Sequence, residues 1–342
     1  MSDVITIGLD LAKNVFQVHG VDGSGEVVIR KQLRRTQVLP FFRKQPRCLV
    51  GMEACASAHH WARELGALGH EVRIMPAHYV KPYVKRNKND AADAAAIAEA
   101  VTRPSMRFVA VKEAEQQGLM LLHRSRALLV RQRTMLVNAI RAHLTEFGIV
   151  APVGLRGLKS LLAVIDDGGD ERLPAPARDC LGSLARALAA VEREAALAER
   201  RICVWHRHNQ ASRNLASIPG IGPIIASALV ASVSDPEVFR TGRELAAWIG
   251  LVPRQNSTGG KARMGRISKQ GDPYLRWLLV AGAMAVIRHG RKTGFKDDPW
   301  LADLIARKPA KVAAVALANK NARTAWALLV SGETYRSQTA RA

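Results

Sequence analysis

Four carboxylates in the first hundred residues are the side chains best suited to chemistry. Asp10 and Glu53 each end an apolar run, and Asp90 and Asp93 lie three residues apart in a later segment. The chain around them has 51 lysine and arginine residues against 29 acids, a net charge of +22. Carboxylate oxygens are ligands that Mg²⁺ prefers, and two such ions stabilise the attacking and leaving oxygens of a phosphodiester. The four acids predict a site for two Mg²⁺ ions that acts on a phosphate backbone.

Each acid also has a simpler explanation when it is taken alone. Asp10 is then a turn residue at the end of a strand, and Glu53 is a solvated residue at the entrance to a helix. Asp90 and Asp93 are then favourable charges at a helix N-terminus. The order and spacing of all four together favour the metal site.

Apolar periodicity predicts the elements that must position these acids. Alternation along the first strand sends Asp10 to the same face as Thr6 and Gly8, and a helix brings Asp90 and Asp93 to one side. Three strands followed by alternating helix and strand are a mixed α/β order that matches the ribonuclease H-like fold. The predicted strands are 4–9, 14–20, 26–33, 48–52 and 71–75, and the predicted helices are 36–44, 57–68 and 89–101.

The middle third has a different pattern. Residues 113–147 form one helical repeat with leucines at positions 122, 129 and 136 and with most arginines off that stripe. The helix either packs in a core with solvated arginines or forms the arm of a coiled-coil dimer. Residues 148–176 are predicted to be a loop or linker, and 177–208 a second helix. The whole segment is therefore interpreted as a helical connector.

The C-terminal third begins with a glycine-containing turn. Pro219-Gly220-Ile221-Gly222-Pro223 precedes an apolar helix at 224–233. Such a turn between two helices is typical of a helix-hairpin-helix, in which Gly220 and Gly222 let backbone N–H groups approach a phosphate. The alternative is an ordinary turn between helices.

Two further groups of residues carry positive charge beside polar or acidic positions. Residues 254–269 combine Ser257 with glycines and with cations that can surround a phosphate. By composition alone Ser257 is a loop residue, since a serine needs a base or a metal to become a nucleophile. The residues that precede Asp90 either hold a phosphate beside the metals or form a solvated face. The predicted nucleic-acid contacts are Lys13, Lys81, Lys85, Arg86, Lys88, Gly220, Gly222, Arg254, Lys261, Arg263, Arg266, Lys269 and Arg276.

Composition limits the class of protein. A pI near 10.7 favours nucleic acid as the partner, although an anionic membrane surface would also attract this charge. No apolar stretch approaches the roughly 20 residues needed to span a bilayer, so we expect a cytoplasmic, nucleoid-associated protein. At 342 residues the chain exceeds one typical core. The predicted divisions are an α/β domain at 1–110, a connector at 111–210, a mostly helical domain at 211–332 and a disordered tail at 333–342.

These motifs together resemble a known family. Gly8-Leu9-Asp10-Leu11-Ala12-Lys13-Asn14, Gly51-Met52-Glu53-Ala54, Lys88-Asn89-Asp90-Ala91-Ala92-Asp93-Ala94 and the block 219–276 resemble the "one-ten" family of bacterial insertion-sequence transposases. The segments 10–18 and 83–90 look most like its "eleven-eleven" subgroup. These enzymes are DEDD recombinases related to pilin-gene invertases and guided by a bridge RNA. The resemblance extends over nearly the whole chain.

The resemblance implies a fold and a mechanism. It implies an N-terminal RuvC-like domain with Asp10, Glu53, Asp90 and Asp93 as Mg²⁺ ligands, a coiled-coil connector, and a C-terminal transposase domain with a nucleophilic serine. That serine is assigned to Ser257, with Ser268 as the competing assignment. The active site would be composite between subunits, which implies a dimer that assembles into a tetramer on DNA. Excision and insertion would proceed through a phosphoserine intermediate, with the bridge RNA choosing the sites.

Two other classes of enzyme remain as alternatives. A RuvC-like structure-specific endonuclease of the Holliday-junction type would use the same acids with water as the nucleophile, so that Ser257 would be dispensable. An actin-like or sugar-kinase ATPase shares the core of the fold and an early aspartate. However, Ala12-Lys13-Asn14 replaces the small turn expected around ATP phosphates.

Overall fold

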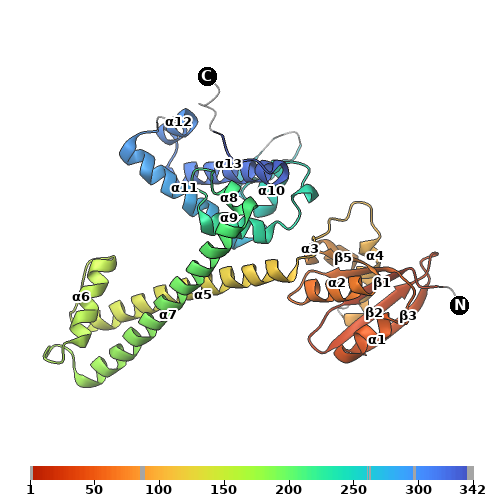
Figure 1. The fold of residues 1–342 in the computed structure, drawn as a ribbon, viewed down its shortest axis with the longest axis horizontal. Coiled ribbons are helices and arrows are strands. Elements are labelled where there is room, and N and C mark those ends of the chain that lie inside the picture. The colour runs from red at the N-terminus through yellow and green to blue at the C-terminus, as the bar shows by residue number, and fades with distance from the viewer. Residues whose placement is uncertain (1–2, 85–88, 260, 262, 296–297, 337–342) are drawn as a thin grey trace. The chain divides into compact units, whose positions relative to one another are not determined.

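The computed structural model describes residues 3–84, 89–259, 261, 263–295 and 298–336. The chain divides after Ala114 into two compact units. The first unit contains a sheet with helices and the second is mostly helical, so the predicted mixed α/β and helical parts are confirmed (Figure 1). The first unit contains β1 (Thr6–Asp10), β2 (Val15–Val21), β3 (Val27–Arg34), η1 (Arg35–Gln37), α1 (Val38–Phe42), β4 (Leu49–Glu53), α2 (Ala58–Ala67), β5 (Glu71–Met75), α3 (Ala77–Val80), η2 (Lys81–Tyr83) and α4 (Asp90–Val101).

The five strands of this unit form one mixed sheet in the order β3-β2-β1-β4-β5. β1 is antiparallel to β2 and parallel to β4, while β3 pairs antiparallel with β2 and β5 pairs parallel with β4. The predicted strands agree with these within two residues at each end. The predicted helix at 36–44 is a 3₁₀ turn followed by the short α1, which contains Pro40.

One face of the sheet carries the main hydrophobic core of the unit. Ile7 and Leu9 of β1 are fully buried on this face, where they pack with Phe42 of α1 and with Trp61 and Leu65 of α2. The alternation predicted for β1 is therefore correct. Because Asp10 follows Leu9 at the end of the strand, it emerges on the opposite face.

That opposite face is covered at its centre by α4. A Cβ atom added to Gly8 would lie within 3.0 Å of the carbonyl oxygen of Ala94 and of Ala98 in this helix. A Cβ atom added to Gly51 of β4 would lie 2.8 Å from the Cβ atom of Val101. Two glycines in the sheet and small residues in α4 thus allow the helix to lie directly on β1 and β4.

The second unit is built from helices and one short hairpin. Its longest helices are α5 and α7, which correspond to the two long helices predicted for the connector. The predicted division of this unit at residue 211 stays a prediction. The elements are α5 (Ala114–Glu146), α6 (Leu155–Asp166), α7 (Ala175–His208), α8 (Gln210–Leu215), α9 (Pro223–Ser232), η3 (Pro236–Val238), α10 (Gly242–Ile249), β6 (Pro253–Gln255), β7 (Met264–Ile267), α11 (Pro273–Thr293), α12 (Pro299–Arg307) and α13 (Ala310–Ser331).

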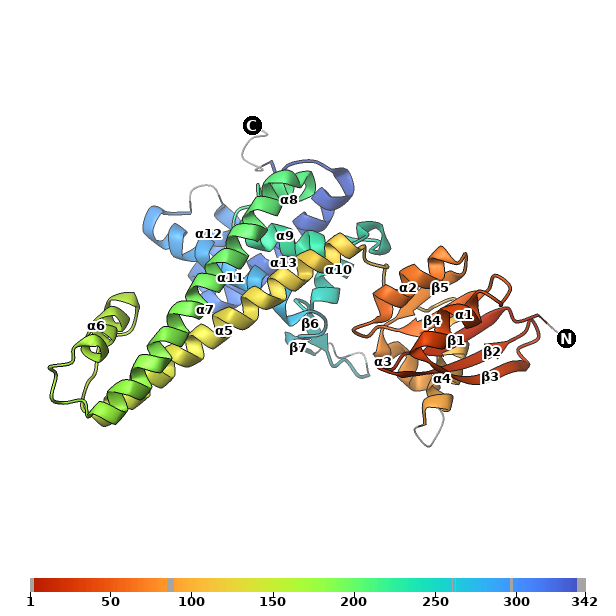
Figure 2. The same cartoon turned by 60° about the horizontal axis from the view of Figure 1, so that its bottom comes forward.

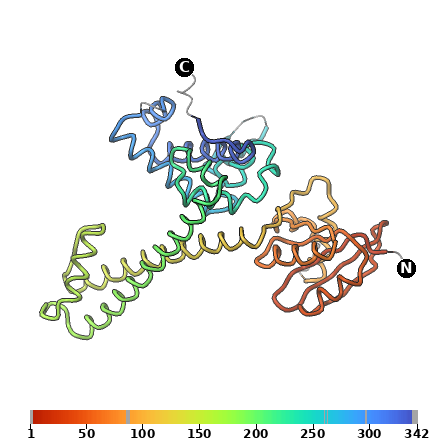
Figure 3. Tube along the Cα trace, viewed as in Figure 1, coloured from red at the N-terminus to blue at the C-terminus, as the bar shows by residue number. Residues whose placement is uncertain are grey.

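α5 and α7 run antiparallel as a long hairpin within one chain (Figures 2 and 3). Arg126 of α5 pairs with Glu199 of α7 at 2.8 Å, and the Arg133–Glu192 pair follows at 2.9 Å. Leucine and isoleucine side chains from both helices fill the seam further along. Part of the predicted leucine stripe therefore packs within the chain.

The prediction of a loop over residues 148–176 is wrong, because this segment contains α6. Leu158, Leu161 and Ile165 recur at helical spacing and pack on Ile140 and Leu144 of α5. The flanking glycine and proline residues favour a loop and obscure this short amphipathic pattern in the sequence. The segment connects the two long helices and packs against the hairpin at its joined end.

The remaining helices form a second core in which α11 and α13 lie against α9 and α10. The chain crosses α11 closely at one point, where a Cβ atom on Gly220 would lie 3.0 Å from the carbonyl oxygen of Gly282. After α13 the described chain continues to residue 336 without helix. The rest of the predicted tail, residues 337–342, lies outside the described residues.

Candidate metal centre and basic hairpin

Three of the four predicted acids meet in the first unit. Carboxylate oxygens of Asp10, Asp90 and Asp93 all lie within 4.8 Å of one another. Asp10 and Asp93 are partly buried and Asp90 is exposed. Residues about 80 positions apart in the sequence are therefore brought together by the packing of α4 on β1.

The local sequence explains how α4 presents its two acids. Asn89 is the N-cap residue, and its side-chain oxygen accepts a hydrogen bond of 2.7 Å from the backbone N–H of Ala92. Asp90 and Asp93 lie in the first helical turn, where unpaired backbone N–H groups favour negative charge. The three-residue spacing then directs both side chains to one side of the helix.

Glu53 ends β4, which pairs in parallel with β1 through Leu9 and Met52. The carboxyl ends of these neighbouring strands lie at the same edge of the sheet. Among the residues that the structure describes, the group of mutually close carboxylates does not include Glu53. Glu53 is thus placed next to the cluster by its strand, and its role as a metal ligand stays a prediction.

The donor set fits a hard divalent cation. Three carboxylate oxygens at this separation repel one another unless a positive charge lies between them. Mg²⁺ is bound through one or two carboxylates together with waters and substrate phosphates, and Ca²⁺ and Mn²⁺ also take oxygen ligands. Asp10, Asp90 and Asp93 are therefore the residues that would hold such an ion.

Several predicted phosphate contacts lie near these acids in the sequence. Lys13 is exposed in the turn between β1 and β2, shortly after Asp10, and Lys81 is exposed in η2. Lys85, Arg86 and Lys88 lie outside the described residues.

In the second unit the predicted basic segment forms a small hairpin. β6 and β7 pair antiparallel, with Pro253 opposite Ile267 and Gln255 opposite Met264. The sequence predicts an adaptable loop here, and the paired strands give that loop a fixed base. The cations with exposed side chains on this hairpin and its loop are Lys261, Arg263, Arg266 and Lys269.

Two other predicted phosphate contacts hold the backbone of this region. The Arg254 guanidinium donates to the carbonyl oxygen of Ser268 at 3.1 and 3.3 Å. The Arg276 guanidinium donates to the carbonyl oxygens of Ile249 and Gln270 at 2.7 and 2.9 Å. Arg254 therefore ties the two strands together at the base of the hairpin, and Arg276 of α11 ties the chain after the hairpin to α10.

The two candidate serines differ in their surroundings. Ser257 is exposed in the loop between β6 and β7. Ser268 is only 9% exposed, and its backbone N–H donates to the carbonyl oxygen of Val252 at 2.8 Å. Its hydroxyl accepts a hydrogen bond from the backbone N–H of Gln270 at 3.4 Å. Ser257 is thus open to a large substrate, and Ser268 is part of the framework.

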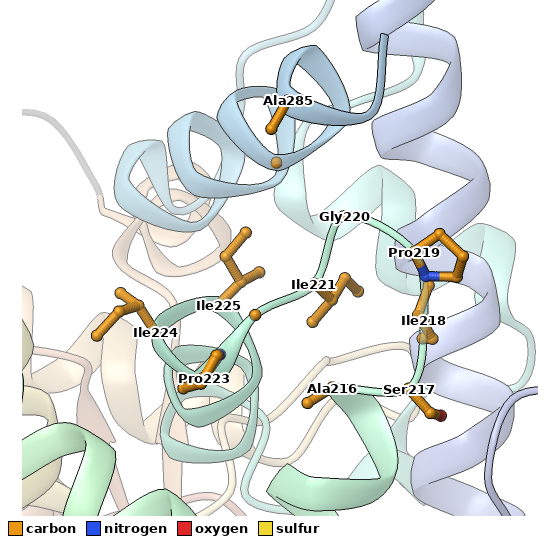
Figure 4. Close-up of a pocket in the computed structure, with 12 residues that line it drawn as sticks. Ala216, Ser217, Ile218, Pro219, Gly220, Ile221, Pro223, Ile224, Ile225 and Ala285 are labelled. Atoms are coloured by element: carbon orange, nitrogen blue, oxygen red, sulfur yellow. The ribbon is translucent and has the colours of Figure 1, made fainter. Parts of the chain in front are cut away.

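The predicted glycine turn joins α8 and α9 beside a cavity of about 480 Å³. Figure 4 shows the turn that carries Gly220, with Ala285 of α11 across this cavity. Gly220 has a φ angle of +88° and packs against α11, whereas a Cβ atom on Gly222 would meet no atom within 4 Å. Gly220 is therefore required by packing, and only Gly222 leaves the backbone at the start of α9 open.

A buried polar network in the second unit was not predicted from the sequence. His123 of α5 is 3% exposed, and its ring nitrogens lie 3.1 Å from the hydroxyl oxygens of Tyr274 and Ser227. Because the Ser227 hydroxyl donates to the carbonyl oxygen of Pro223, its oxygen accepts from His123 and the other ring nitrogen accepts from Tyr274. Burial, assisted by the charge of Arg126, lowers the pKa of His123 to about 4. A histidine beside a leucine stripe gave no sequence signal for this role.

No helix in the described part of the chain combines the length and the apolar character needed to cross a membrane.

Comparisons with known proteins identify the family of the chain. A family model described as "Transposase", of the DEDD type of the IS110 group, matches residues 7–149, which contain all four acids. A second model, "Transposase IS116/IS110/IS902 family", matches residues 212–297, which contain the glycine turn and the basic hairpin.

Individual relatives match over almost the entire chain. A "Probable family 20 transposase" of Pseudomonas aeruginosa is 53% identical over 331 residues, which cover 96% of this chain and 98% of the relative. The "Transposase for insertion sequence element IS1111A" of Coxiella burnetii is 40% identical, with 98% and 92% of the two chains covered. The "Transposase for insertion sequence element IS1328" of Yersinia enterocolitica is 38% identical, with 98% and 99% covered. The chain belongs to the IS116/IS110/IS902 family of insertion-sequence transposases, enzymes that cleave DNA and transfer its strands.

Proposed function

We propose that this transposase cleaves and rejoins DNA at a site formed by its acid cluster together with Ser257. The observation that carries the proposal is the convergence of Asp10, Asp90 and Asp93 within 4.8 Å. Asp10, Asp90 and Asp93, with Glu53 at the neighbouring strand end, are proposed to hold divalent metal, expected to be two Mg²⁺ ions. When bound, the metal polarises phosphoryl oxygens and lowers the pKa of a hydroxyl group beside it.

Ser257 is the proposed nucleophile because it is exposed on a loop rich in cations. Its Oγ atom forms a bond to phosphorus while the bond between phosphorus and one sugar oxygen breaks. The hydroxyl proton passes to that leaving oxygen. The resulting phosphoserine ester keeps the energy of the phosphodiester, so the strand can be rejoined without ATP. The exposed cations of the hairpin stabilise the charged phosphate during this step.

The active site is proposed to be shared between copies of the chain. One copy contributes the acids and another contributes the serine, in a dimer that assembles into a tetramer on DNA. A row of exposed apolar residues on α5 supports contact between copies: Leu121, Leu128 and Met135 are 65%, 51% and 63% exposed at seven-residue spacing.

A strand-transfer assay on a supercoiled donor tests the chemistry. Asp10→Asn and Ser257→Ala are each expected to abolish product, and Ser268→Ala is expected to retain it. Denaturing gels should show a covalent protein–DNA adduct with the wild type and with Ser268→Ala only. An adduct that disappears in Ser268→Ala and persists in Ser257→Ala would overturn the assignment of the serine.

Mixing the variants tests the sharing of the site. If the acids and the serine come from different copies, Asp10→Asn mixed with Ser257→Ala forms some complete sites and regains part of the activity. If both groups come from the same copy, the mixture stays inactive.

An endonuclease with water as the nucleophile is the second candidate, because it needs only the acid cluster. In that case Ser257→Ala would cleave normally and no adduct would form with any variant.

The choice of target by a bridge RNA is a separate proposal that rests on the family resemblance. Omitting the RNA transcribed from the ends of the element should then abolish site-specific products.

A further inference from the structure

A polar strip of the sheet adjoins the acid cluster on the same face. Asp10 of β1 lies opposite Gln17 of β2, and Gln17 lies opposite Gln32 of β3. In the next row, His19 of β2 lies between Gly8 and Arg30. Side chains directly opposite one another on antiparallel strands stand about 5 Å apart. The strip therefore extends without interruption from Asp10 to the sheet edge at β3.

Gln17, His19, Arg30 and Gln32 of this strip form the floor of a groove of about 1050 Å³ that begins beside Asp10. One wall is the side of α4 that carries Ala91, Ala95 and Ala98. These side chains project little from the helix, so an extended ligand can lie close to it. Because α4 covers the centre of β1, the open floor consists of β2 and β3, a width that suits one polynucleotide strand rather than a duplex.

The charges of the groove favour a polyanion. Arg30 is exposed on its floor, and its positive charge helps burial to lower the pKa of His19. The two acids that line the groove each have a partner that also lines it. Asp22 accepts hydrogen bonds from the turn before β3, including one of 2.7 Å from the Ser24 hydroxyl, and Glu99 pairs with Arg103 at 2.6 Å.

We infer that this groove binds one strand of DNA next to the phosphate that is cleaved. The inference rests on the proposed function, because the strip begins at Asp10. Gln17 and Gln32 donate side-chain amide hydrogens to phosphate and sugar oxygens, and Arg30 pairs with a phosphate. Contacts of this kind hold the strand in register without selecting a sequence.

Lys31 provides a matched control. It is adjacent to Arg30 in β3 and also borders the groove, but its Nζ atom lies on the other face of the sheet, 5.7 Å from the Phe41 ring centroid. Arg30→Glu and Lys31→Glu therefore make the same change of charge on opposite faces. Thermal unfolding would confirm that both variants fold, and Arg30→Gln provides a milder change.

The experiment measures binding of fluorescent single-stranded DNA to the full chain in EDTA by anisotropy. Arg30→Glu should weaken binding at least five-fold, Arg30→Gln should weaken it less, and Lys31→Glu should change it less than two-fold. The slope of log K against log salt should fall by about 0.7 in Arg30→Gln, as one phosphate contact is lost. Equal losses in Arg30→Glu and Lys31→Glu, or no loss in either, would overturn the inference. A loss seen with RNA of the same sequence and not with DNA would also overturn it.

The outcome is separable from that of the proposed function. If Arg30→Glu binds DNA as the wild type does while Asp10→Asn cannot transfer strands, the groove assignment fails and the transposase site stands. If Asp10→Asn still transfers strands, the proposed site fails regardless of DNA binding in the groove.

Discussion

The backbone of Gly8 in β1 lies directly against the carbonyl oxygen of Ala94 in α4. This contact sets the distance between the strand that ends in Asp10 and the helix that begins with Asp90. Any side chain at position 8 must push the helix away from the sheet. The metal centre therefore depends on the absence of a side chain two residues before its first acid.

Gly8→Ala is expected to destabilise the chain by about 2–3 kcal/mol and to lower activity further than the loss of folded protein explains. Both effects follow from displacement of α4 and of its two acids. Chemical denaturation measures the loss of stability, and a strand-transfer assay measures the loss of activity. Gly66→Ala in α2 is the control, because a Cβ atom there meets nothing within 4 Å, and it should be neutral or slightly stabilising.

Metal binding should be visible as a change in thermal stability. Mg²⁺ or Mn²⁺ is expected to raise the melting temperature of the wild type, since the ion binds only the folded acid cluster. Asp93→Asn should abolish most of this rise and should not lower the melting temperature in EDTA, because it removes repulsion among the carboxylates. Glu26→Gln, in an exposed turn, should respond to metal as the wild type does. An unchanged rise in Asp93→Asn would refute the ligand assignment.

His123 predicts a specific dependence of stability on pH. Its folded-state pKa of about 4 lies below the ordinary value of 6.5, so the unfolded chain binds the proton more readily between these values. The contribution of this shift to the free energy of unfolding is fully present above pH 6.5 and is lost as the pH falls toward 4. The total is about 3 kcal/mol at 1.36 kcal/mol per pKa unit.

Urea denaturation between pH 7 and pH 4.5 measures this contribution. His19 and His206 have pKa values lowered by burial and add to the same trend, so the comparison must be between the wild type and His123→Gln. His123→Gln should be less stable at pH 7, and the difference should shrink as the pH falls. Parallel curves for the two proteins would show that His123 is not the titrating group.

Substitutions of the two glycines in the turn before α9 should have separate effects, one on stability and the other on DNA binding. Gly220→Ala is expected to destabilise the chain by about 2–4 kcal/mol, because φ is positive and α11 lies against it. Gly222→Ala should change stability by less than about 1 kcal/mol and weaken DNA binding several-fold, since its Cβ atom would enter the space before the helix. Unchanged DNA affinity in Gly222→Ala would mean that the turn is only structural.

The apolar row on α5 should contribute to self-association. Leu128→Glu is expected to shift the chain toward monomer, because a charge would be buried between copies. Thr134→Glu places the same charge at another exposed position of α5 and should leave the oligomer unchanged. Light scattering after size-exclusion chromatography measures the mass. The same oligomer in both variants would exclude this face as the contact.

The sequence by itself determined the local elements and the acidic nature of the candidate metal site. Alternation fixed which face of β1 carries Asp10, and the spacing of Asp90 and Asp93 placed both on one side of a helix, since these patterns follow from backbone geometry. The long helices were equally predictable from their period. The short α6 was missed because glycine and proline residues flank its 12 residues and favoured a loop.

Only the tertiary structure decided which residues lie close together in space. The packing of α4 on Gly8 brought three acids together, and strand pairing aligned Gln17, Gln32 and Arg30 beside them. It also distinguished the exposed Ser257 from the buried Ser268, although both lie in the same basic segment. These relationships join residues far apart in the chain. They depend on close packing and strand register, which local sequence patterns do not encode.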